Sequence, residues 1–473
     1  MRVPLVACWL PLLLAIVIRV PGLVQDFWFD EAWSWLLVQQ LVASPLDVLT
    51  RVHVDNNHPL NSLFLYLLGE HVSWVVYRVP ALMFGIASVA LAGRILSRRG
   101  RAHAMVAMIL TGCSYPLIVY SSEARGYAPM IFFVLLAIDA YERFLVTRAW
   151  PALATFWAAV VLGFLSHLTF VHAYGAILVW TGYEARKRRG AFGALAELAG
   201  SQSVPLLFVA TLYLVFIRHL HVAGGEPAPL LSVLAETAGA TLGTPPHGVW
   251  LWTAIAALGL VVSGGLRTVR RIDPGLFVFF LAGIIVVPGL TVLLEFQRAA
   301  LVEPRFFPRY FLVSITLCLL VGAWMLGEQV QHGGVRRRVA AAVIAAYVLG
   351  NLWQTAAFIR YGRGHYREAL THMAQETADA NIRVASNSEL RTRVLLAFHG
   401  RALPAGRTVI FYGRTSPRVD EVDWHIREDV QPTTSVPLAM DDGRGHRFQL
   451  TARYAFYGLS GSQWSLYQRQ PRR

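Results

Sequence analysis

Long apolar segments recur through the first 360 residues of this chain. Examples are the runs from Val3 to Val24, from Ala104 to Tyr120 and from Leu276 to Leu294. Each is close to the roughly 20 residues that a helix needs to cross a hydrocarbon core of about 30 Å. The pattern therefore predicts a polytopic membrane protein.

Taken in order, the apolar runs predict about eleven transmembrane helices within residues 1–360. Two outer loops, 24–71 and 219–248, are long enough to hold structure of their own. The predicted fold class is thus an all-α polytopic membrane bundle. The predicted spans are residues 3–23, 72–93, 103–120, 127–146, 150–165, 168–183, 201–218, 249–266, 275–294, 309–327 and 339–359.

Basic residues between the predicted spans are unequally divided between the two sides of the membrane. Alternate connections carry sixteen Arg and Lys residues, whereas the opposite loops and span ends carry six. Cytoplasmic loops are the ones enriched in Lys and Arg, so the N-terminus is predicted inside and the C-terminus outside. This topology accounts for the net charge of +14, and we expect no nucleic-acid partner.

From about Tyr361 the sequence becomes polar, with 16 Arg against 11 Asp and Glu residues. It contains no apolar run long enough to cross a membrane. Residues 366–380 have a helical pattern, and residues 407–412 and 448–456 have the pattern of strands. We therefore predict a separate soluble α/β domain over residues 361–473, on the outer side of the membrane.

Two adjacent carboxylates, Asp30 and Glu31, stand among Trp28, Phe29 and Trp33 at the start of the first outer loop. The segment is amphipathic, as in a helix that lies in the membrane interface. A carboxylate surrounded by aromatic rings can act as a general base for a hydroxyl group. These residues fit equally with Asp30 as the N-cap of the helix that follows.

A polar cluster with His53, Asp55 and His58 follows in the same loop, directly before a short apolar segment, 60–69. This segment is too short to span a membrane and is predicted to be re-entrant or interfacial. Polar groups at such a place often line a site. The His and Asp spacing matches no closed zinc pattern, and an ordinary turn before Pro59 also explains the cluster.

Glu123 and Arg125 lie in a short turn, 120–127, between two long apolar runs. Ionisable groups at this depth are costly unless they pair or bind a ligand. They can pair with neighbouring groups, or Arg125 can face a phosphate, for which a guanidinium is well suited.

Three arginines, Arg298, Arg305 and Arg309, stand beside aromatic residues in the outer segment 295–310. Positive charge on the outer side runs against the topological trend. Anionic lipid headgroups explain it, and so does a lipid phosphate substrate.

Four segments together resemble the ordered landmarks of GT-C glycosyltransferases, in particular bacterial protein O-mannosyltransferase-like and lipid A sugar transferase-like families. The resemblance covers about residues 20–360, and the trailing outer domain also fits some members. The segments are Trp28-Phe29-Asp30-Glu31-Ala32, Asn57-His58-Pro59-Leu60, Ser122-Glu123-Ala124-Arg125-Gly126-Tyr127-Ala128 and Pro308-Arg309-Tyr310.

The resemblance implies inverting transfer of a sugar from a polyprenyl-phosphate donor to a hydroxyl of a lipid, glycan or protein acceptor. The reaction would take place at the outer face of the inner (plasma) membrane, with the C-terminal domain in the periplasm or outside the cell. Asp30 would be the catalytic base, with Glu31 beside it. The substrate-binding residues would be His58, Glu123, Arg125, Arg305, Arg309 and Tyr310.

One departure from the family concerns His58. Many relatives have two prolines after this histidine, whereas the chain reads His58-Pro59-Leu60-Asn61, so the motif does not assign a role to His58. Some relatives use a divalent cation and others do not. Asp30, Glu31 and Glu123 offer oxygen ligands for one, which leaves metal dependence open.

Two other classes of function fit a polytopic chain. A transporter or flippase for a lipid-linked or anionic substrate also carries charged groups, but transporters often show inverted repeats, and the sequence has no internal repeat. A membrane scaffold whose C-terminal domain binds a partner would not need Asp30, Glu123 and Arg125.

The cation asymmetry yields a direct test of topology. A reporter that is active only outside the cytoplasm, fused after Arg473, should be active because the C-terminus is predicted outside. The measurement is reporter activity in intact cells, with a cytoplasm-only reporter at the same point as the control. Activity of the cytoplasm-only reporter would overturn the predicted orientation.

Overall fold

The structure is a computed structural model. It describes residues 5–70, 73–221, 228–298, 305–431, 433, 435–442 and 444–470. The chain forms two compact units, each made of two stretches of sequence. The first unit comprises Met1–Leu23 and Ala43–Thr355, and the second comprises Val24–Val42 and Ala356–Arg473.

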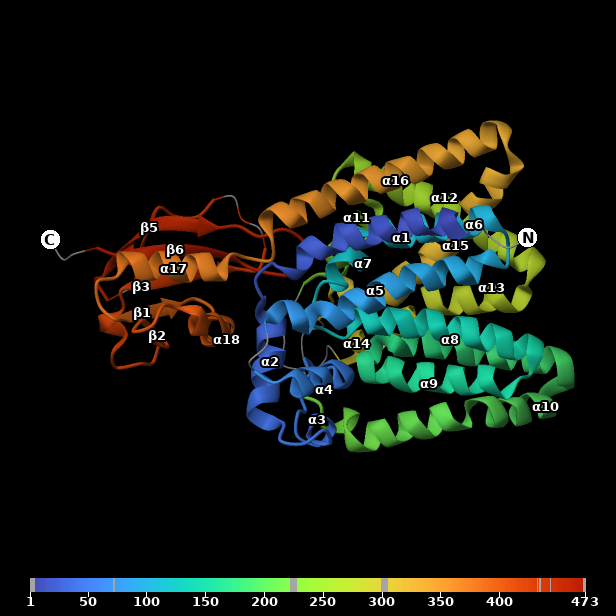
Figure 1. Cartoon of the computed structure of the whole chain (residues 1–473), viewed down its shortest axis with the longest axis horizontal. Coiled ribbons are helices and arrows are strands. Elements are labelled where there is room, and N and C mark those ends of the chain that lie inside the picture. Colours follow the sequence, from blue (N-terminus) through green and yellow to red (C-terminus); the bar gives the residue numbers. More distant parts are fainter. Residues whose placement is uncertain are drawn as a thin grey trace. The chain divides into compact units, whose positions relative to one another are not determined.

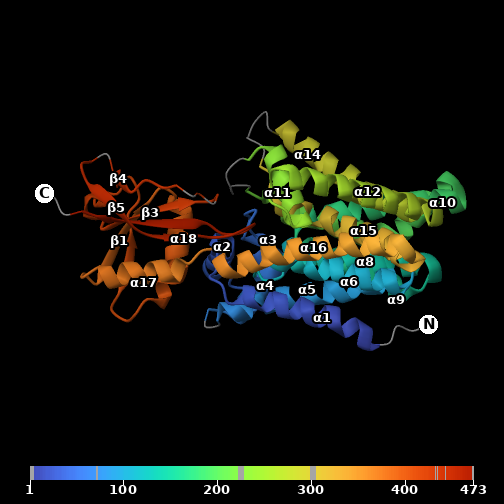
Figure 2. The ribbon, with the colours of Figure 1, turned by 90° about the horizontal axis from the view of Figure 1, so that it is seen from above.

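The first unit is helical, and long helices lie side by side in it (Figures 1 and 2). Helix α8 packs between α5 and α9, and α6 packs between α5 and α15. The α-helices are α1 (Leu5–Arg19), α3 (Asp47–Thr50), α4 (Pro59–Leu68), α5 (Trp74–Ser97), α6 (Arg101–Cys113), α7 (Tyr115–Tyr120), α8 (Tyr127–Thr147), α9 (Trp150–Ser166), α10 (Val171–Val215), α11 (Leu230–Leu242), α12 (Val249–Ile272), α13 (Pro274–Leu281), α14 (Val287–Arg298), α15 (Leu312–His332) and α16 (Gly334–Tyr361).

Six helical segments of the described chain are long and apolar enough to cross a membrane. Large apolar side chains such as Leu10, Leu207 and Leu260 are mostly exposed on these and neighbouring helices, as expected of surfaces that face lipid. Each predicted span falls on helical structure, and the count of eleven stays a prediction. The six segments are Trp74–Ser97, Leu195–His219, Val249–Ile272, Pro274–Gln297, Pro308–His332 and Gly334–Glu376.

Two predicted spans, 168–183 and 201–218, lie largely within α10, whose bounds include two helices joined at a kink. Its regular geometry is broken at Gly190, with φ 69° and ψ −171°, a conformation that glycine adopts readily. The predicted span 275–294 contains a π-helical turn, η4 (Ala282–Val286), directly before Pro288. Proline lacks an N–H donor, and a π turn is one of the usual ways in which a helix accommodates such a break.

The second unit contains a six-stranded mixed sheet with the order β2-β1-β3-β6-β5-β4. Strand β1 pairs in parallel with β2 and β3, and the remaining pairs are antiparallel. Helix α17 (Tyr366–Glu376) packs against β5 and β6, and α18 (Glu389–His399) packs against β1 and β2 (Figure 1). The strands are β1 (Asn381–Ser386), β2 (Thr408–Phe411), β3 (Trp424–Asp429), β4 (Ala439–Asp441), β5 (Arg447–Tyr454) and β6 (Gln463–Arg469).

Helix α2 (Phe29–Leu41) belongs to this second unit, although the sequence placed it in an outer loop of the transmembrane domain. Trp28, Phe29 and Ala32 are buried in one hydrophobic core with residues of α17, α18 and the sheet. The position of this helix in the membrane interface stays a prediction. An amphipathic pattern specifies an apolar face, and here the partner of that face is protein.

The turn between α7 and α8 packs tightly against the C-terminal end of α9. A Cβ atom on Gly126 would lie 1.8 Å from the carbonyl oxygen of Ser166 and 3.0 Å from Cβ of His58. A backbone oxygen cannot move without shifting the end of the helix. Glycine at this position therefore allows the α7–α8 turn and the residue before α4 to approach each other.

We expect Gly126→Ala to destabilise the protein by roughly 1–3 kcal/mol or more, because the added methyl group overlaps backbone atoms. The measurement is the thermal unfolding midpoint of the purified protein in detergent. Gly182→Ala, inside α10 with no atom within 4 Å of the added Cβ, is the matched control and should be neutral or slightly stabilising. Equal midpoints for the two variants would contradict the close packing.

Candidate functional site

The loop before α4 is held in place by asparagine side chains. Asn57 donates from Nδ2 to the carbonyl oxygens of Val48 and Val52, at 2.8 Å each, and its Oδ1 accepts from Ser62 at 2.7 Å. Asn61 donates to the carbonyl oxygen of Ala124 at 2.8 Å. These bonds join the start of α4 to the turn between α7 and α8, so two of the motif segments are neighbours in the structure.

Arg125 is buried in this region, with 3% of its surface exposed. Its guanidinium donates to Oδ1 of Asn56 and, at 3.4 Å, to the hydroxyl of Tyr127. The guanidinium carbon lies 5.6 Å from the centroid of the Tyr127 ring. Asn56 and Tyr127 thus fix the position of the guanidinium group.

Three rings stack beside Arg125. The His58 and His167 rings are 4.7 Å apart, with an interplanar angle of 27°. Tyr127 lies 5.3 Å from the His58 ring and 4.6 Å from the His167 ring. His58 is the residue directly before α4, and His167 is the residue between α9 and the next turn of helix. Two of the rings thus come from connections between helices, and the third, Tyr127, is the first residue of α8.

Both imidazoles are kept neutral by their surroundings. Burial lowers the pKa of His58 and of His167 well below the usual value, and the nearby guanidinium of Arg125 lowers both further. Arg309 acts on both rings in the same direction. Arg125 and Arg309 are therefore close enough to influence the same pair of rings, although 183 positions of sequence separate them.

Arg309 is held among aromatic rings in the short helix η5 (Pro308–Phe311). Its guanidinium carbon lies 4.1 Å from the centroid of the Phe307 ring and 5.9 Å from that of Tyr310. Arg305 lies three residues before this helix and is partly buried. Two other parts of the predicted segment 295–310 lie outside the described residues, namely Glu303 and the side chain of Arg298.

Glu123 is completely buried in the turn between α7 and α8, where the backbone N–H of Arg125 donates to its carbonyl oxygen at 2.8 Å. A second carboxyl group of this unit, Glu236 on α11, was not singled out from the sequence. Burial raises the pKa of Glu236, and Arg309 opposes that shift. Two carboxyl groups and two guanidinium groups thus belong to this part of the bundle.

Asp30 and Glu31 lie in the second unit, at the start of α2. The residue that caps this helix is Trp28, and its backbone N–H donates to the carboxylate of Glu31 at 3.4 Å. Asp30 is the second residue of the helix and is 7% exposed. The interpretation of Asp30 as the N-cap is therefore wrong, and Glu31 has the capping role instead.

The residues that sequence reasoning missed are two polar groups, His167 and Glu236. His167 separates two predicted spans, and a histidine at such a place was a usable signal. Glu236 gave none, because it stands alone in a long outer loop. Within the described residues, no group of three or more His, Cys, Asp or Glu side chains is placed to hold a metal ion.

Comparison with solved structures finds the same fold in two proteins. One is ArnT from Cupriavidus metallidurans in the apo state, with a TM-score of 0.53, 12% identity and 97% of each chain covered. The other is the archaeal oligosaccharyltransferase AglB from Archaeoglobus fulgidus, in complex with an inhibitory peptide and a dolichol-phosphate. That match has a TM-score of 0.50 and 11% identity, and it covers 90% of this chain and 69% of AglB.

No family model and no curated protein sequence matches the chain. At 11–12% identity the two structural matches establish the fold. Both proteins belong to the GT-C superfamily, which the four motif segments predicted. The chain therefore has the fold of the GT-C membrane glycosyltransferases.

Proposed function

We propose that the chain is a membrane glycosyltransferase that moves a sugar from a polyprenyl-phosphate donor to an acceptor hydroxyl, with inversion at the anomeric carbon. One observation carries the proposal: Arg125 and Arg309, from distant parts of the sequence, act on the same pair of buried, neutral imidazoles. Two guanidinium groups so placed suit a ligand with the charge and size of a phosphate.

The arginines would stabilise the leaving group. As the acceptor oxygen bonds to the anomeric carbon, the bond from that carbon to the phosphate oxygen breaks, and the electron pair leaves with the lipid phosphate. Preorganised cations stabilise the charge that develops there. Arg125 is already fixed by Asn56 and Tyr127, so it would need little rearrangement during the reaction.

The histidines would contribute as neutral groups. A buried imidazole with a strongly lowered pKa cannot serve as a charged partner of the phosphate at neutral pH. Its ring N–H can still donate a hydrogen bond. We assign His58 and His167 to the wall of the donor site, beside Arg125. We also assign Arg305 and Tyr310, which lie close to Arg309 in sequence, and Glu123 to this site.

Asp30 would be the general base, accepting the proton of the acceptor hydroxyl as the new bond forms. Its carboxylate is not the cap of α2, which Glu31 provides through the N–H of Trp28. A buried carboxylate without that local structural role is a better candidate for chemistry than one that caps a helix. Glu31 then supports the helix on which the base is placed.

The donor and its location follow from the same chemistry. A polyprenyl tail must stay in lipid while its phosphate is in the site, so the reaction belongs at a membrane surface. The predicted topology and the family resemblance assign it to the outer face of the plasma (inner) membrane. The matching archaeal structure contains a dolichol-phosphate, a lipid phosphate of the class proposed here. The acceptor hydroxyl belongs to a lipid, a glycan or a protein.

The proposal predicts that Asp30→Asn lowers sugar transfer by roughly 10²-fold or more, because the amide keeps the shape of the side chain and cannot accept the proton. The measurement is transfer from a polyprenyl-phosphate sugar by purified protein, with donors first screened on the wild type. Asp47→Asn is the matched control. Asp47 accepts the backbone N–H groups of Ala43 and Ser44, a turn that the amide oxygen can preserve, so its transfer should be near normal.

Near-normal transfer by Asp30→Asn, at equal amounts of folded protein, would contradict the assignment of the base. Glu31 would then be tested next. Loss of transfer in both variants would indicate damage to the loop rather than removal of a base. A transporter or flippase of the same lipid would bind the donor without any sugar transfer by the wild type.

A further inference from the structure

Helix α18 contacts the start of α2 at several points within the second unit. Nε2 of His399 lies 2.8 Å from the carbonyl oxygen of Phe27, a hydrogen bond when that nitrogen carries the proton. The ring of Phe398 stacks on Phe27, with centroids 4.9 Å apart and an interplanar angle of 10°. The same Phe398 ring meets Trp35 edge-on at 5.4 Å. Asp30 lies between these two contact points in sequence.

The contacts come from one face of α18. Arg391, Leu395 and Phe398 are spaced by four and three residues, which places them on the same side of a helix. Leu395 is buried in the core that also holds Phe29 and Ala32 of α2. This face of α18 therefore forms the support on which the Asp30 helix packs.

Arg391 links this support to the residue next to Asp30. Its guanidinium carbon lies 4.7 Å from the centroid of the Phe29 ring, which is the geometry of a cation–π contact. Its Nε donates to Oε1 of Glu428 at 3.1 Å. The Arg391 side chain is 21% exposed, whereas that of Glu428 is fully buried.

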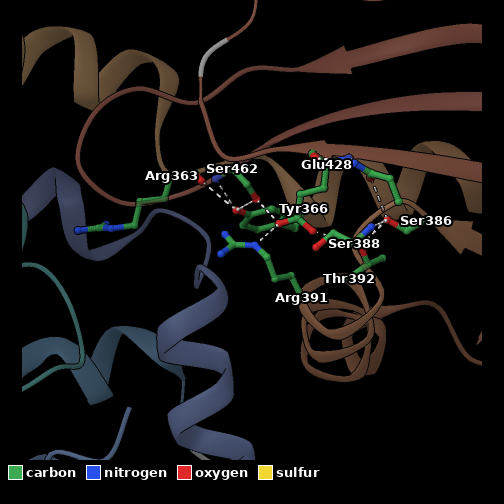
Figure 3. A network of polar contacts seen from close by, with 9 residues as sticks. Arg363, Tyr366, Ser386, Ser388, Arg391, Thr392, Glu428 and Ser462 are labelled. Carbon is green, nitrogen blue, oxygen red and sulfur yellow. Dashed lines mark hydrogen bonds and ion pairs between the residues drawn. The ribbon is translucent and has the colours of Figure 1, made fainter. Parts of the chain in front are cut away.

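The carboxylate of Glu428 is fixed by a polar network in the interior of the sheet domain (Figure 3). Its Oε1 also accepts from Oγ of Ser462 at 2.6 Å, and its Oε2 accepts from Oγ1 of Thr392 at 3.2 Å. Ser462 is in turn 3.0 Å from the hydroxyl of Tyr366. These partners hold the Glu428 carboxylate in one orientation. The carboxylate in turn holds the Arg391 guanidinium in one orientation.

The roles proposed for the donor site and the catalytic base do not explain why Arg391 and Glu428 form this network. Glu428 and Arg391 have no part in the proposed chemistry, and a buried ion pair is weak evidence for a contribution to stability. Such pairs are better at selecting one arrangement of the groups around them. Here the ion pair selects the arrangement of the Phe29 ring. Phe29 is the first residue of α2, and Asp30 is the second.

We propose that Arg391, held by Glu428, is a positioning residue for Asp30, so that the C-terminal domain sets the orientation of the catalytic base. This inference rests on the proposed function, in which Asp30 takes the acceptor proton. Arg391 acts through the Phe29 ring and the first turn of α2. Small displacements of a reacting group are enough to lower rates strongly.

The test uses the full chain and the double variant Arg391→Met with Glu428→Gln, which removes the cation and the buried carboxylate together and leaves no unpaired buried charge. We expect kcat for sugar transfer to fall roughly 10-fold, with KM for the polyprenyl-phosphate donor within about twofold of wild type. Donor binding is unaffected because Arg125 and Arg309 belong to the other unit.

Arg393→Met is the matched control. Arg393 is on the same helix and lies over the ring of Phe411 at 5.5 Å, but it is 62% exposed and has no contact with α2 among the contacts described here. Its kcat should match that of the wild type. Equal kcat values for the control and the double variant, at equal thermal midpoints, would overturn the inference. A change confined to KM would do so as well.

A second variant separates positioning from general loosening of the domain. Phe29→Leu removes the ring on which Arg391 acts and keeps an apolar side chain in the core. If Arg391 works through Phe29, adding Arg391→Met and Glu428→Gln to Phe29→Leu should lower kcat by less than twofold further, because interacting positions are not additive. Full multiplication of the two effects would show that they are independent and would contradict the proposal.

The Asp30→Asn result distinguishes a failure of the positioning role of Arg391 from a failure of the proposed function. If Asp30→Asn abolishes transfer while the double variant is normal, the positioning role of Arg391 fails and the proposed function stands. If Asp30→Asn is normal, the base assignment fails, and the positioning role fails with it.

Discussion

A lipid phosphate can leave a sugar only where its charge is stabilised, and an apolar bundle offers few places for the cations that do so. We assign this part to two cations, Arg125 and Arg309, both of which lower the pKa of His58 and His167. Arg125 is buried and donates to the amide oxygen of Asn56 and to the hydroxyl of Tyr127. The tight turn at Gly126 and the asparagine bonds around α4 serve to keep this arrangement in place.

Residues assigned to the proposed reaction occur in both units of the chain. The groups suited to the leaving phosphate lie in the helical unit, whereas Asp30 lies on a helix built into the core of the sheet domain. In the proposed account α18 and the Glu428 network hold the first turn of α2, so the orientation of the assigned base would depend on residues more than 350 positions later in the chain.

The sequence predicted the parts of the structure that follow from local pattern. Apolar runs located the helices, and alternation located β2 and β5, whereas β1, β3, β4 and β6 were not predicted. The order of motifs predicted the GT-C fold. The partner of α2 was not predictable, because an amphipathic pattern shows that a face is buried and not what covers it. His167 and Glu236 were missed since their roles depend on which connections meet in space.

The most direct test of the account is a structure of the full chain with a bound polyprenyl phosphate, determined in a lipid nanodisc. The account predicts density for the phosphate within about 4 Å of the guanidinium groups of both Arg125 and Arg309, beside the His58 and His167 rings. A phosphate bound away from Arg125 and Arg309 would contradict the central claim that these two arginines form the donor site.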